Sequence, residues 1–293
     1  MNKEEHFPNL FLLGVQKAGT TMLYDLFKGH PSIFLPENKE PHYFSCNEYY
    51  DKGLGYYLNY YKRARNQKYL ADFTPDYLFW PLAFERMAKF ITEETKFIVS
   101  LRQPATRAYS QYNMMVSRGF NMNGFENDLS NEVVDLQSPE QTNLLRPSHM
   151  IARGQYSVQL ERLFNLVPKK QIKIIIFEEW VKKRGETIQE LEEFLDIPHS
   201  KNDISQNSIS NPTLIYPSNS LVKHLKNLNT WILKSSISQN KLLLKAKEQF
   251  KGQIGKKPEK LSMLKLKEIT EMYFLEDIKK CEQLLNRDLS LWY

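Results

Sequence analysis

The 293-residue sequence is poor in cysteine: it contains only Cys46 and Cys281, which lie far apart in the chain. Two thiols are too few for a disulfide framework or a zinc site, so we expect neither. The stretch MNKEEHFPNLFLLG (1–14) also lacks the long apolar run of a secretory signal or a membrane anchor. We therefore expect a protein of the reducing cytoplasm.

Positive charge is unevenly distributed along a chain of otherwise ordinary globular composition. The formal net charge is +6, yet residues 221–260 contain ten lysines and only two glutamates, so the rest of the chain is slightly acidic. Such a basic segment is either a solvated helix face or a surface that attracts an anionic ligand, an acceptor or a peripheral membrane contact. We expect a single domain over residues 1–293, a long loop over 199–220, and no nucleic-acid partner.

Short apolar runs typical of buried strands alternate with longer patterns typical of helices. The strands are predicted at 10–14, 68–73, 96–101 and 172–177, and the helices at 20–28, 81–91, 104–117, 156–166 and 261–285. This alternation predicts an α/β fold, in which helices flank a central parallel sheet as a three-layer sandwich. Ligands of such sheets bind beyond the carboxyl ends of the strands, here in the loops after Leu13, Phe73 and Leu101.

The first of these loops is similar to a phosphate-binding loop whose lysine is misplaced. Gly14 and Gly19 have the spacing of Gly-x-x-x-x-Gly-Lys-Ser/Thr, but Thr20 occupies the lysine position, and Lys17 lies inside the loop. Backbone N–H groups that open into a helix bind anions in either case, so a P-loop-like anion site is expected. The missing lysine argues against ATP, and Asp72 is the only candidate for a magnesium carboxylate. The alternative is a tight strand-to-helix turn with an incidental lysine.

A second motif, VSLRQPATRAYSQY (99–112), carries an arginine and a serine at the start of a predicted helix. Arg102 follows a strand, Pro104 suits a first helical position, and Ser110 lies about two turns into the helix. Both side chains are then within reach of one phosphate. Taken alone, this motif is better explained by surface charges at Arg102 and Arg107 and by a helix-filling Ser110.

Together the two motifs resemble the sulfotransferases that use 3′-phosphoadenosine 5′-phosphosulfate (PAPS), especially the carbohydrate type that includes heparan sulfate enzymes and many bacterial proteins. Further similar stretches are KEPHYF (39–44), TPDYL (74–78), RGQYSVQLERLF (153–164) and the final RDLSLWY. The resemblance implies transfer of a sulfuryl group from PAPS, with 3′-phosphoadenosine 5′-phosphate (PAP) as product. The acceptor would be a hydroxyl or amine of a carbohydrate, a glycolipid or another small molecule, and no metal would be required.

The resemblance also assigns roles to residues. The donor's 5′-phosphosulfate would lie on the loop GVQKAGTT, and its 3′-phosphate on the second motif; the residues concerned are Gln16, Lys17, Ala18, Gly19, Thr20, Thr21, Arg102 and Ser110. Lys17 would stabilise charge on the leaving phosphate. Glu40 would be the general base, with His42 as the rival base, and burial is expected to raise the pKa of Glu40 toward neutrality.

Acceptor contacts are predicted less specifically. Candidates are Lys39, His42, Tyr77, Arg153 and Tyr156, although an exposed lysine and packing tyrosines explain the same residues. One departure from the resemblance is Phe73, where the heparan sulfate enzymes carry a lysine.

Two other functions fit parts of the sequence. A nucleotide kinase with an aberrant loop is disfavoured by Thr20, which stands where its lysine should be. A non-catalytic protein that binds anions or polysaccharides would use the basic segment 221–260. Glu40 distinguishes this hypothesis from that of an enzyme, because a binding protein needs no base at the mouth of the loop.

Overall fold

The computed structural model describes residues 7–132, 134, 149–199 and 256–293. The predicted loop over 199–220 and the basic segment 221–260 therefore lie almost entirely outside the described residues. In the described part of the chain, no helix is long and apolar enough to cross a membrane.

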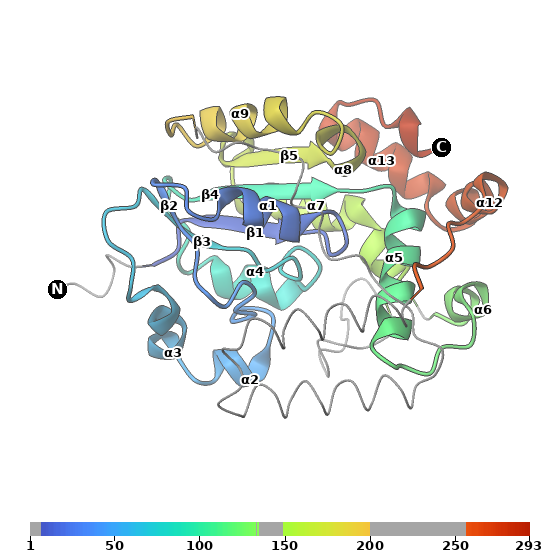
Figure 1. The fold of residues 1–293 in the computed structure, drawn as a ribbon, viewed down its shortest axis with the longest axis horizontal. Helices are drawn as coiled ribbons and strands as arrows, with labels where there is room; N and C mark the ends of the chain where they lie inside the picture. The colour runs from blue at the N-terminus through green and yellow to red at the C-terminus, as the bar shows by residue number, and fades with distance from the viewer. Residues whose placement is uncertain (1–6, 133, 135–148, 200–255) are drawn as a thin grey trace.

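The sheet that the described residues form has five strands in the order β2–β3–β1–β4–β5, and every neighbouring pair is parallel (Figure 1). The strands are β1 (Leu10–Gly14), β2 (Ile33–Phe34), β3 (Tyr69–Asp72), β4 (Lys96–Leu101) and β5 (Ile172–Ile176). The central strands β1, β3 and β4 are almost wholly buried, which explains why they are continuous apolar runs rather than alternating ones. Because all strands are parallel, their carboxyl ends meet at one edge of the sheet.

Helices connect the strands and cover both faces of the sheet. The α-helices described are α1 (Thr20–Phe27), α2 (Asn47–Tyr50), α3 (Leu54–Leu58), α4 (Pro81–Met87), α5 (Pro104–Ser117), α6 (Phe125–Ser130), α7 (Tyr156–Leu166), α8 (Phe177–Trp180), α9 (Arg184–Phe194), α12 (Met263–Tyr273) and α13 (Leu275–Leu285). Short 3₁₀ turns occur at Asn59–Tyr61, Ala152–Gly154, Lys169–Gln171 and Ser290–Trp292.

Alternate residues of β1 point to different layers. Leu10 and Leu12 belong to an apolar cluster with α1 and α9, whereas Phe11 and Leu13 belong to a second cluster with α4, α5, α7 and α13. The three-layer α/β sandwich predicted from the sequence is thus confirmed.

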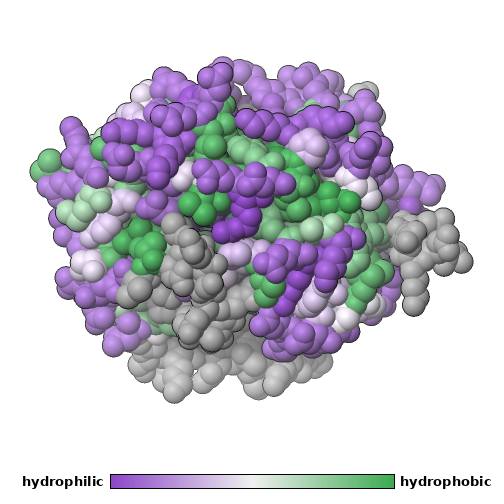
Figure 2. All heavy atoms as spheres, turned by 180° about the vertical axis from the view of Figure 1, so that it is seen from behind, coloured by the Kyte–Doolittle hydropathy of each residue, from purple (hydrophilic) through white to green (hydrophobic). Residues whose placement is uncertain are grey.

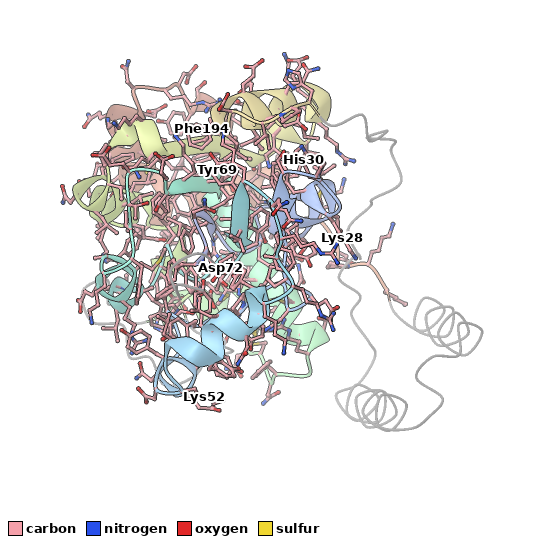
Figure 3. The ribbon with its side chains drawn as sticks, turned by 90° about the vertical axis from the view of Figure 1, so that its left-hand side faces the viewer. Lys28, His30, Lys52, Tyr69, Asp72 and Phe194 are labelled. Atoms are coloured by element: carbon pink, nitrogen blue, oxygen red, sulfur yellow. The ribbon has the colours of Figure 1, made fainter. Side chains whose placement is uncertain are left out.

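Seen from behind, the coloured surface is mostly hydrophilic, and hydrophobic residues are exposed between the hydrophilic ones (Figure 2). Figure 3 shows Asp72 inside the molecule and Lys28 and Lys52 at its surface.

The predicted elements match closely where the local pattern is strong. The strands at 10–14 and 96–101 and the helices at 104–117 and 156–166 have the predicted bounds. The sequence reading missed β2, which is only two residues long, and α9, whose stretch RGETIQELEEF has few apolar residues.

The prediction of one continuous last helix over 261–285 is wrong. The chain breaks at Phe274, whose φ of −129° ends α12 before α13 begins. The ring of Phe274 packs so closely on Gly154 that a Cβ at that glycine would lie 2.6 Å from it. Long-range packing, rather than a local stop signal, divides this helix.

Helix α7 begins at a buried carboxylate supplied by α13. Asp277 accepts hydrogen bonds from the backbone N–H groups of Tyr156 (2.6 Å) and Ser157 (3.1 Å) and from the Ser157 hydroxyl (2.5 Å). These are N–H groups that a helix start leaves without an intrahelical partner. Asp277 therefore both caps α7 and attaches the C-terminal helices to the sheet domain.

We expect Asp277→Ala to lower the free energy of unfolding by about 2–4 kcal/mol, because it strands several buried donors at once. Urea denaturation of the whole chain measures this loss. The matched control is Glu276→Ala: this neighbouring carboxylate is 81% exposed and pairs only with Lys279 among the residues described. The control should cost less than about 1 kcal/mol. Equal losses in the two variants would contradict the capping role.

Candidate functional site

The β1–α1 loop is fastened to the end of β4. Val15 donates a backbone hydrogen bond to the Ser100 carbonyl (2.8 Å), and the Ser100 hydroxyl donates to the Ala18 carbonyl (2.7 Å). Arg102 then donates through Nη1 to the Lys17 carbonyl (2.8 Å). The two motifs found in the sequence are therefore in direct contact, at the point of the sheet where ligands of parallel α/β folds bind.

Gly19 closes the loop at the N-terminus of α1, where no side chain fits. Its φ is +80°, and an added Cβ would lie 2.5 Å from Trp180 and 2.8 Å from Phe177, both on α8. Trp180 also donates through Nε1 to the Ser100 hydroxyl (3.2 Å). Among the residues described, no side-chain cap is found for α1, so the N–H groups of its first turn are available to an anion.

Lys17 is a partly buried cation among other cations. Its ammonium makes no hydrogen bond or ion pair with the residues that the structure describes, and its backbone has the unusual φ of 75°. Burial, together with the charges of Arg102, Arg118 and Arg107, lowers the pKa of Lys17 to about 8, against a weaker opposite effect of Glu40. A buried ammonium without an ion pair among the described residues, with other cations around it, fits a ligand that carries several negative charges.

Arg102 and Ser110 line a single pocket of about 360 Å³ beside this loop, together with Thr106 and Asn113 of α5. The opposite wall is the segment 258–261 before α12. The guanidinium of Arg102 lies over the Phe177 ring at 4.8 Å, and its buried Nε has no partner in the described structure. The convergence expected from the sequence is thus present, and the arginine retains an unused donor.

A larger cavity of about 460 Å³ lies along β5, α8 and α9. Its charged lining residues are largely paired with one another: Lys173 with Glu190 at 2.9 Å, and Arg287 with Glu179. A cavity whose charges are already neutralised is a weaker anion site than the loop around Lys17, so we place the candidate site at the loop.

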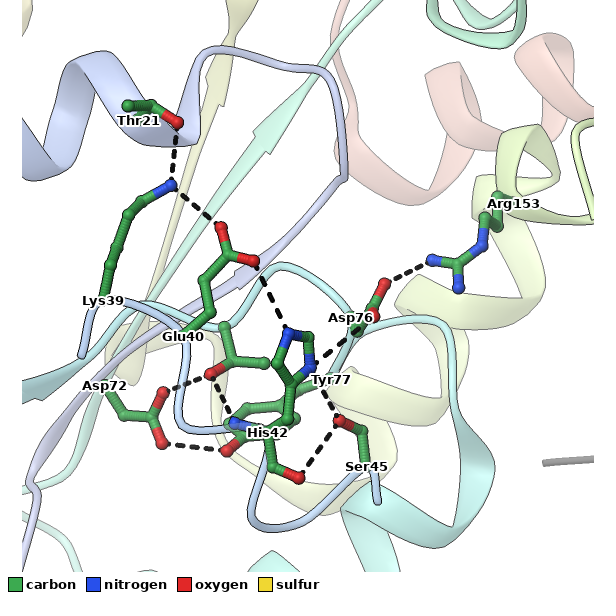
Figure 4. Close-up of polar contacts among 10 residues, drawn as sticks. Thr21, Lys39, Glu40, His42, Ser45, Asp72, Asp76, Tyr77 and Arg153 are labelled. Carbon is green, nitrogen blue, oxygen red and sulfur yellow. Dashed lines mark hydrogen bonds and ion pairs between the residues drawn. The ribbon is translucent and has the colours of Figure 1, made fainter. Parts of the chain in front are cut away.

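Three consecutive polar contacts link the loop to the segment after β2 (Figure 4). The Lys39 ammonium donates to the Thr21 hydroxyl (2.8 Å) and to Glu40 Oε1 (2.9 Å). Glu40 Oε2 lies 3.5 Å from His42 Nε2. On its other side, the His42 ring lies 3.6 Å from an oxygen of Asp76.

The pKa expected for Glu40 is wrong for this arrangement. Burial alone would raise it, but the hydrogen bond from His42 and the charge and hydrogen bond of Lys39 outweigh that effect and lower the pKa of Glu40 to about 2. Burial alone would lower the pKa of His42, but the contacts of the imidazole with Glu40 and Asp76 outweigh burial and raise it. The carboxylate is therefore ionised and a weak base.

Asp72 lies at the centre of a buried hydroxyl network behind this site. It accepts hydrogen bonds from Tyr57 (2.6 Å), Thr74 (2.6 Å) and Tyr77 (2.9 Å), and burial raises the pKa of Asp72 to about 6 despite them. With its oxygens engaged in this way, Asp72 does not serve as the magnesium carboxylate considered from the sequence. The described residues also contain no group of histidine, cysteine and acidic side chains placed to hold a metal ion.

Two of the predicted acceptor residues need correction. Tyr77 and Tyr156 are fully buried, so neither ring has surface with which to line an acceptor cleft. Tyr156 instead donates its hydroxyl hydrogen bond to the Arg102 carbonyl (2.7 Å) and so supports the arginine. Arg153 is also buried and pairs with Asp76 at 2.5 Å, which places it behind His42.

The structure adds residues that motif reading did not assign. Asp76 stands within the stretch TPDYL, but only the fold brings it beside both His42 and Arg153. Arg118 follows α5 outside every motif, and its charge nevertheless acts on Lys17. No sequence signal marks Arg118, because its role depends on where the end of a 14-residue helix lies.

Comparison with known proteins agrees with these motifs. Residues 7–282 match the family model described as sulfotransferase domain. Heparan sulfate glucosamine 3-O-sulfotransferase 3B1 of Homo sapiens is 32% identical over 122 residues, which are 42% of this chain and 30% of that protein. Heparan sulfate glucosamine 3-O-sulfotransferase 5 of Mus musculus is 24% identical over 194 residues, 66% of this chain and 55% of that protein. The chain thus covers 30% to 55% of the length of these relatives.

The fold is likewise that of a solved protein. The crystal structure of a sulfotransferase from Alicyclobacillus acidocaldarius superposes with a TM-score of 0.66, at 21% sequence identity, over 98% of both chains. At this identity the likeness concerns the fold alone.

The lowered pKa of Lys17 predicts a pH-dependent affinity for anions. The ammonium is charged at pH 7 and mostly neutral above its pKa of about 8, whereas a bound anion would hold the proton to higher pH. Sulfate keeps its double charge over this range, so its affinity should fall about tenfold between about pH 7 and pH 9.5. Titration calorimetry measures it.

In Lys17→Met, sulfate should bind weakly and with little dependence on pH. Lys28→Met removes an exposed lysine at the C-terminal end of α1, the helix that follows the loop, and should behave like the wild type. A wild-type affinity that stays level up to pH 9.5 would show that Lys17 does not contact the anion.

Proposed function

The chain belongs to the sulfotransferase domain family, and we propose that it transfers a sulfuryl group from PAPS to a hydroxyl or amine of a carbohydrate or related acceptor. The observation that carries this proposal is the Lys17 ammonium at the β1–α1 loop, which makes no ion pair with the residues described and whose pKa is lowered by burial and by the charges of Arg102, Arg118 and Arg107. A donor with phosphosulfate and 3′-phosphate groups supplies negative charge at two separate points. This chain offers two matching places, the loop and the pocket of Arg102 and Ser110.

When bound, the donor supplies a sulfuryl group attached to a leaving phosphate, and the residues of the chain position and neutralise it. Open N–H groups of α1 and the ammonium of Lys17 hold the 5′ end, and Thr20 and Thr21 offer hydroxyls there. Arg102 and Ser110 hold the 3′-phosphate, which ATP and AMP lack. Each anionic group then has an N–H, hydroxyl or cationic partner from the chain.

Glu40 takes the proton of the acceptor as the acceptor atom forms its bond to sulfur and the bond from sulfur to the phosphate oxygen breaks. Lys17 stabilises the negative charge that the phosphate oxygen receives. His42, whose ring lies against Asp76, orients the Glu40 carboxylate. Lys39, His42 and Arg153 remain proposed acceptor-side residues, with Arg153 acting from behind through Asp76.

The nucleotide-kinase reading is weaker. It needs a lysine at the position of Thr20 and a free carboxylate to hold magnesium, whereas the oxygens of Asp72 receive three hydroxyl hydrogen bonds. The named substrate of the relatives, a heparan sulfate glucosamine, supports a carbohydrate acceptor here. We also propose a cytoplasmic location, with which the free thiols of Cys46 and Cys281 agree, and a peripheral membrane contact through 221–260.

The direct test has two stages. Thermal shifts with PAP, AMP and ATP ask whether the protein prefers the 3′-phosphorylated nucleotide. Radiolabelled PAPS is then offered with a panel of oligosaccharides that carry free hydroxyl and amine groups, including glucosamine-containing ones. A protein that responds equally to AMP and PAP is not PAPS-dependent. One that binds PAP but labels none of the acceptors is better described as a binding protein.

We expect Arg102→Ala and Ser110→Ala each to weaken PAP binding by about tenfold or more, and to weaken it much more than AMP binding. A hydrogen bond to a charged group is worth roughly 1.5–3 kcal/mol. AMP has no 3′-phosphate and therefore does not make this bond. Calorimetry with both nucleotides measures the difference. Ser117→Ala is the control, because this serine ends the same helix and its hydroxyl donates only to the Met114 carbonyl among the residues described. Equal losses for AMP and PAP would reject the 3′-phosphate assignment.

We expect Glu40→Gln to lose turnover by about 10²–10⁴, the usual range for a positioned general base, while PAP still binds at least as well as to the wild type. The amide keeps the shape of the side chain but cannot take the proton. Initial rates with saturating donor measure the loss, and Glu37→Gln, an exposed carboxylate nearby, is the control. His42→Ala should lose less. The reverse order would assign the base to His42.

A further inference from the structure

The ammonium of Lys39 joins the two halves of the site. It donates to Thr21 on the first turn of α1, where the donor is proposed to bind, and to Glu40, the proposed base (Figure 4). The two distances are 2.8 and 2.9 Å, so one cation makes both contacts at once. The Lys39 side chain is only 19% exposed, which limits how far water screens these contacts.

This contact with Lys39 restrains Glu40. A carboxylate that receives a charged hydrogen bond gives up basicity, because a proton taken from the acceptor would have to displace that bond. His42 also contacts Glu40, but its ring is fixed from the far side by Asp76 and Ser45. Lys39 is the partner with a flexible stem, and its second contact is the threonine hydroxyl at the loop.

An anion on the loop competes for the same ammonium. Thr21 lies on the first turn of α1, so a phosphate held by that turn lies close to the Lys39 nitrogen. A phosphosulfate or phosphate group carries more charge than a single carboxylate, and attraction between charges falls only slowly over a few ångströms. The ammonium therefore has a stronger partner on the Thr21 side once the loop is filled.

We propose that Lys39 is a positioning residue that couples donor binding to base activation: an anion in the β1–α1 loop draws its ammonium away from Glu40, which is then free to accept the acceptor's proton. The inference rests on the proposed function. It gives the site an order, with the base restrained until the donor is present, and it explains why a carboxylate placed as a base is ion-paired in the ligand-free protein.

A double-mutant cycle on PAP binding tests the coupling without any transfer reaction. Kd values for PAP are measured by calorimetry in the wild type, Lys39→Met, Glu40→Gln and the double variant. Glu40→Gln releases Lys39, so PAP should bind about threefold to tenfold more tightly when Lys39 is present. In the Lys39→Met background the same substitution measures only the general effect of removing a negative charge near Lys17, and the gain should be less than about twofold.

Further variants test the same coupling between Lys39 and Glu40 independently. Lys39→Arg keeps a cation of similar reach and should preserve most of the gain. The cycle of Thr21→Val with Glu40→Gln examines the other end of the bridge and replaces the first cycle if Lys39→Met does not fold. Equal gains in both backgrounds would overturn the coupling while leaving the proposed function intact. Failure of every variant and of the wild type to bind PAP would instead overturn the proposed function.

Discussion

The candidate site depends on a partly buried cation, Lys17, whose ammonium makes no ion pair with the residues described. Burial, and after it the charges of Arg102, Arg118 and Arg107, lowers the pKa of this lysine to about 8. The surrounding structure keeps them in place: β4 fastens the loop through Ser100 and Arg102, and the α8 rings leave room only for Gly19. A site that is strained without its ligand is well suited to bind an anion strongly.

Around Glu40, where the acceptor is proposed to bind, the charges are paired and the buried hydroxyls have hydrogen-bond partners. Asp72 is buried beneath three hydroxyl donors, and Asp76 lies between Arg153 and His42. Such networks are rigid because each partner lost would leave a buried polar group alone. They bring Glu40 to the mouth of the loop in one orientation. Lys39 connects this network to the loop region, because its ammonium donates both to Thr21 at the start of α1 and to Glu40.

Relatives that share the family differ in length from this chain, which covers 30% and 55% of the two heparan sulfate enzymes described above. In this chain the sheet itself places the loop and Arg102, which directly follow β1 and β4, whereas Lys39, Glu40 and His42 lie in the segment between β2 and α2. One fold can carry different sites, because such connecting segments vary independently of the sheet.

Sequence by itself determined the strands β1, β3, β4 and β5, the helices α5 and α7, the glycine-containing loop before α1 and the placing of Arg102 and Ser110 along one pocket, because these depend on local periodicity and on spacing along one segment. Tertiary structure alone decided the low pKa of Glu40, the burial of Tyr77 and Tyr156, and the break at Phe274. Each of these is set by groups from other segments, such as His42 around Glu40 and Gly154 beneath Phe274. A sequence pattern specifies which face of an element is apolar, but the electric field and free space around a side chain come from whatever the fold places beside it.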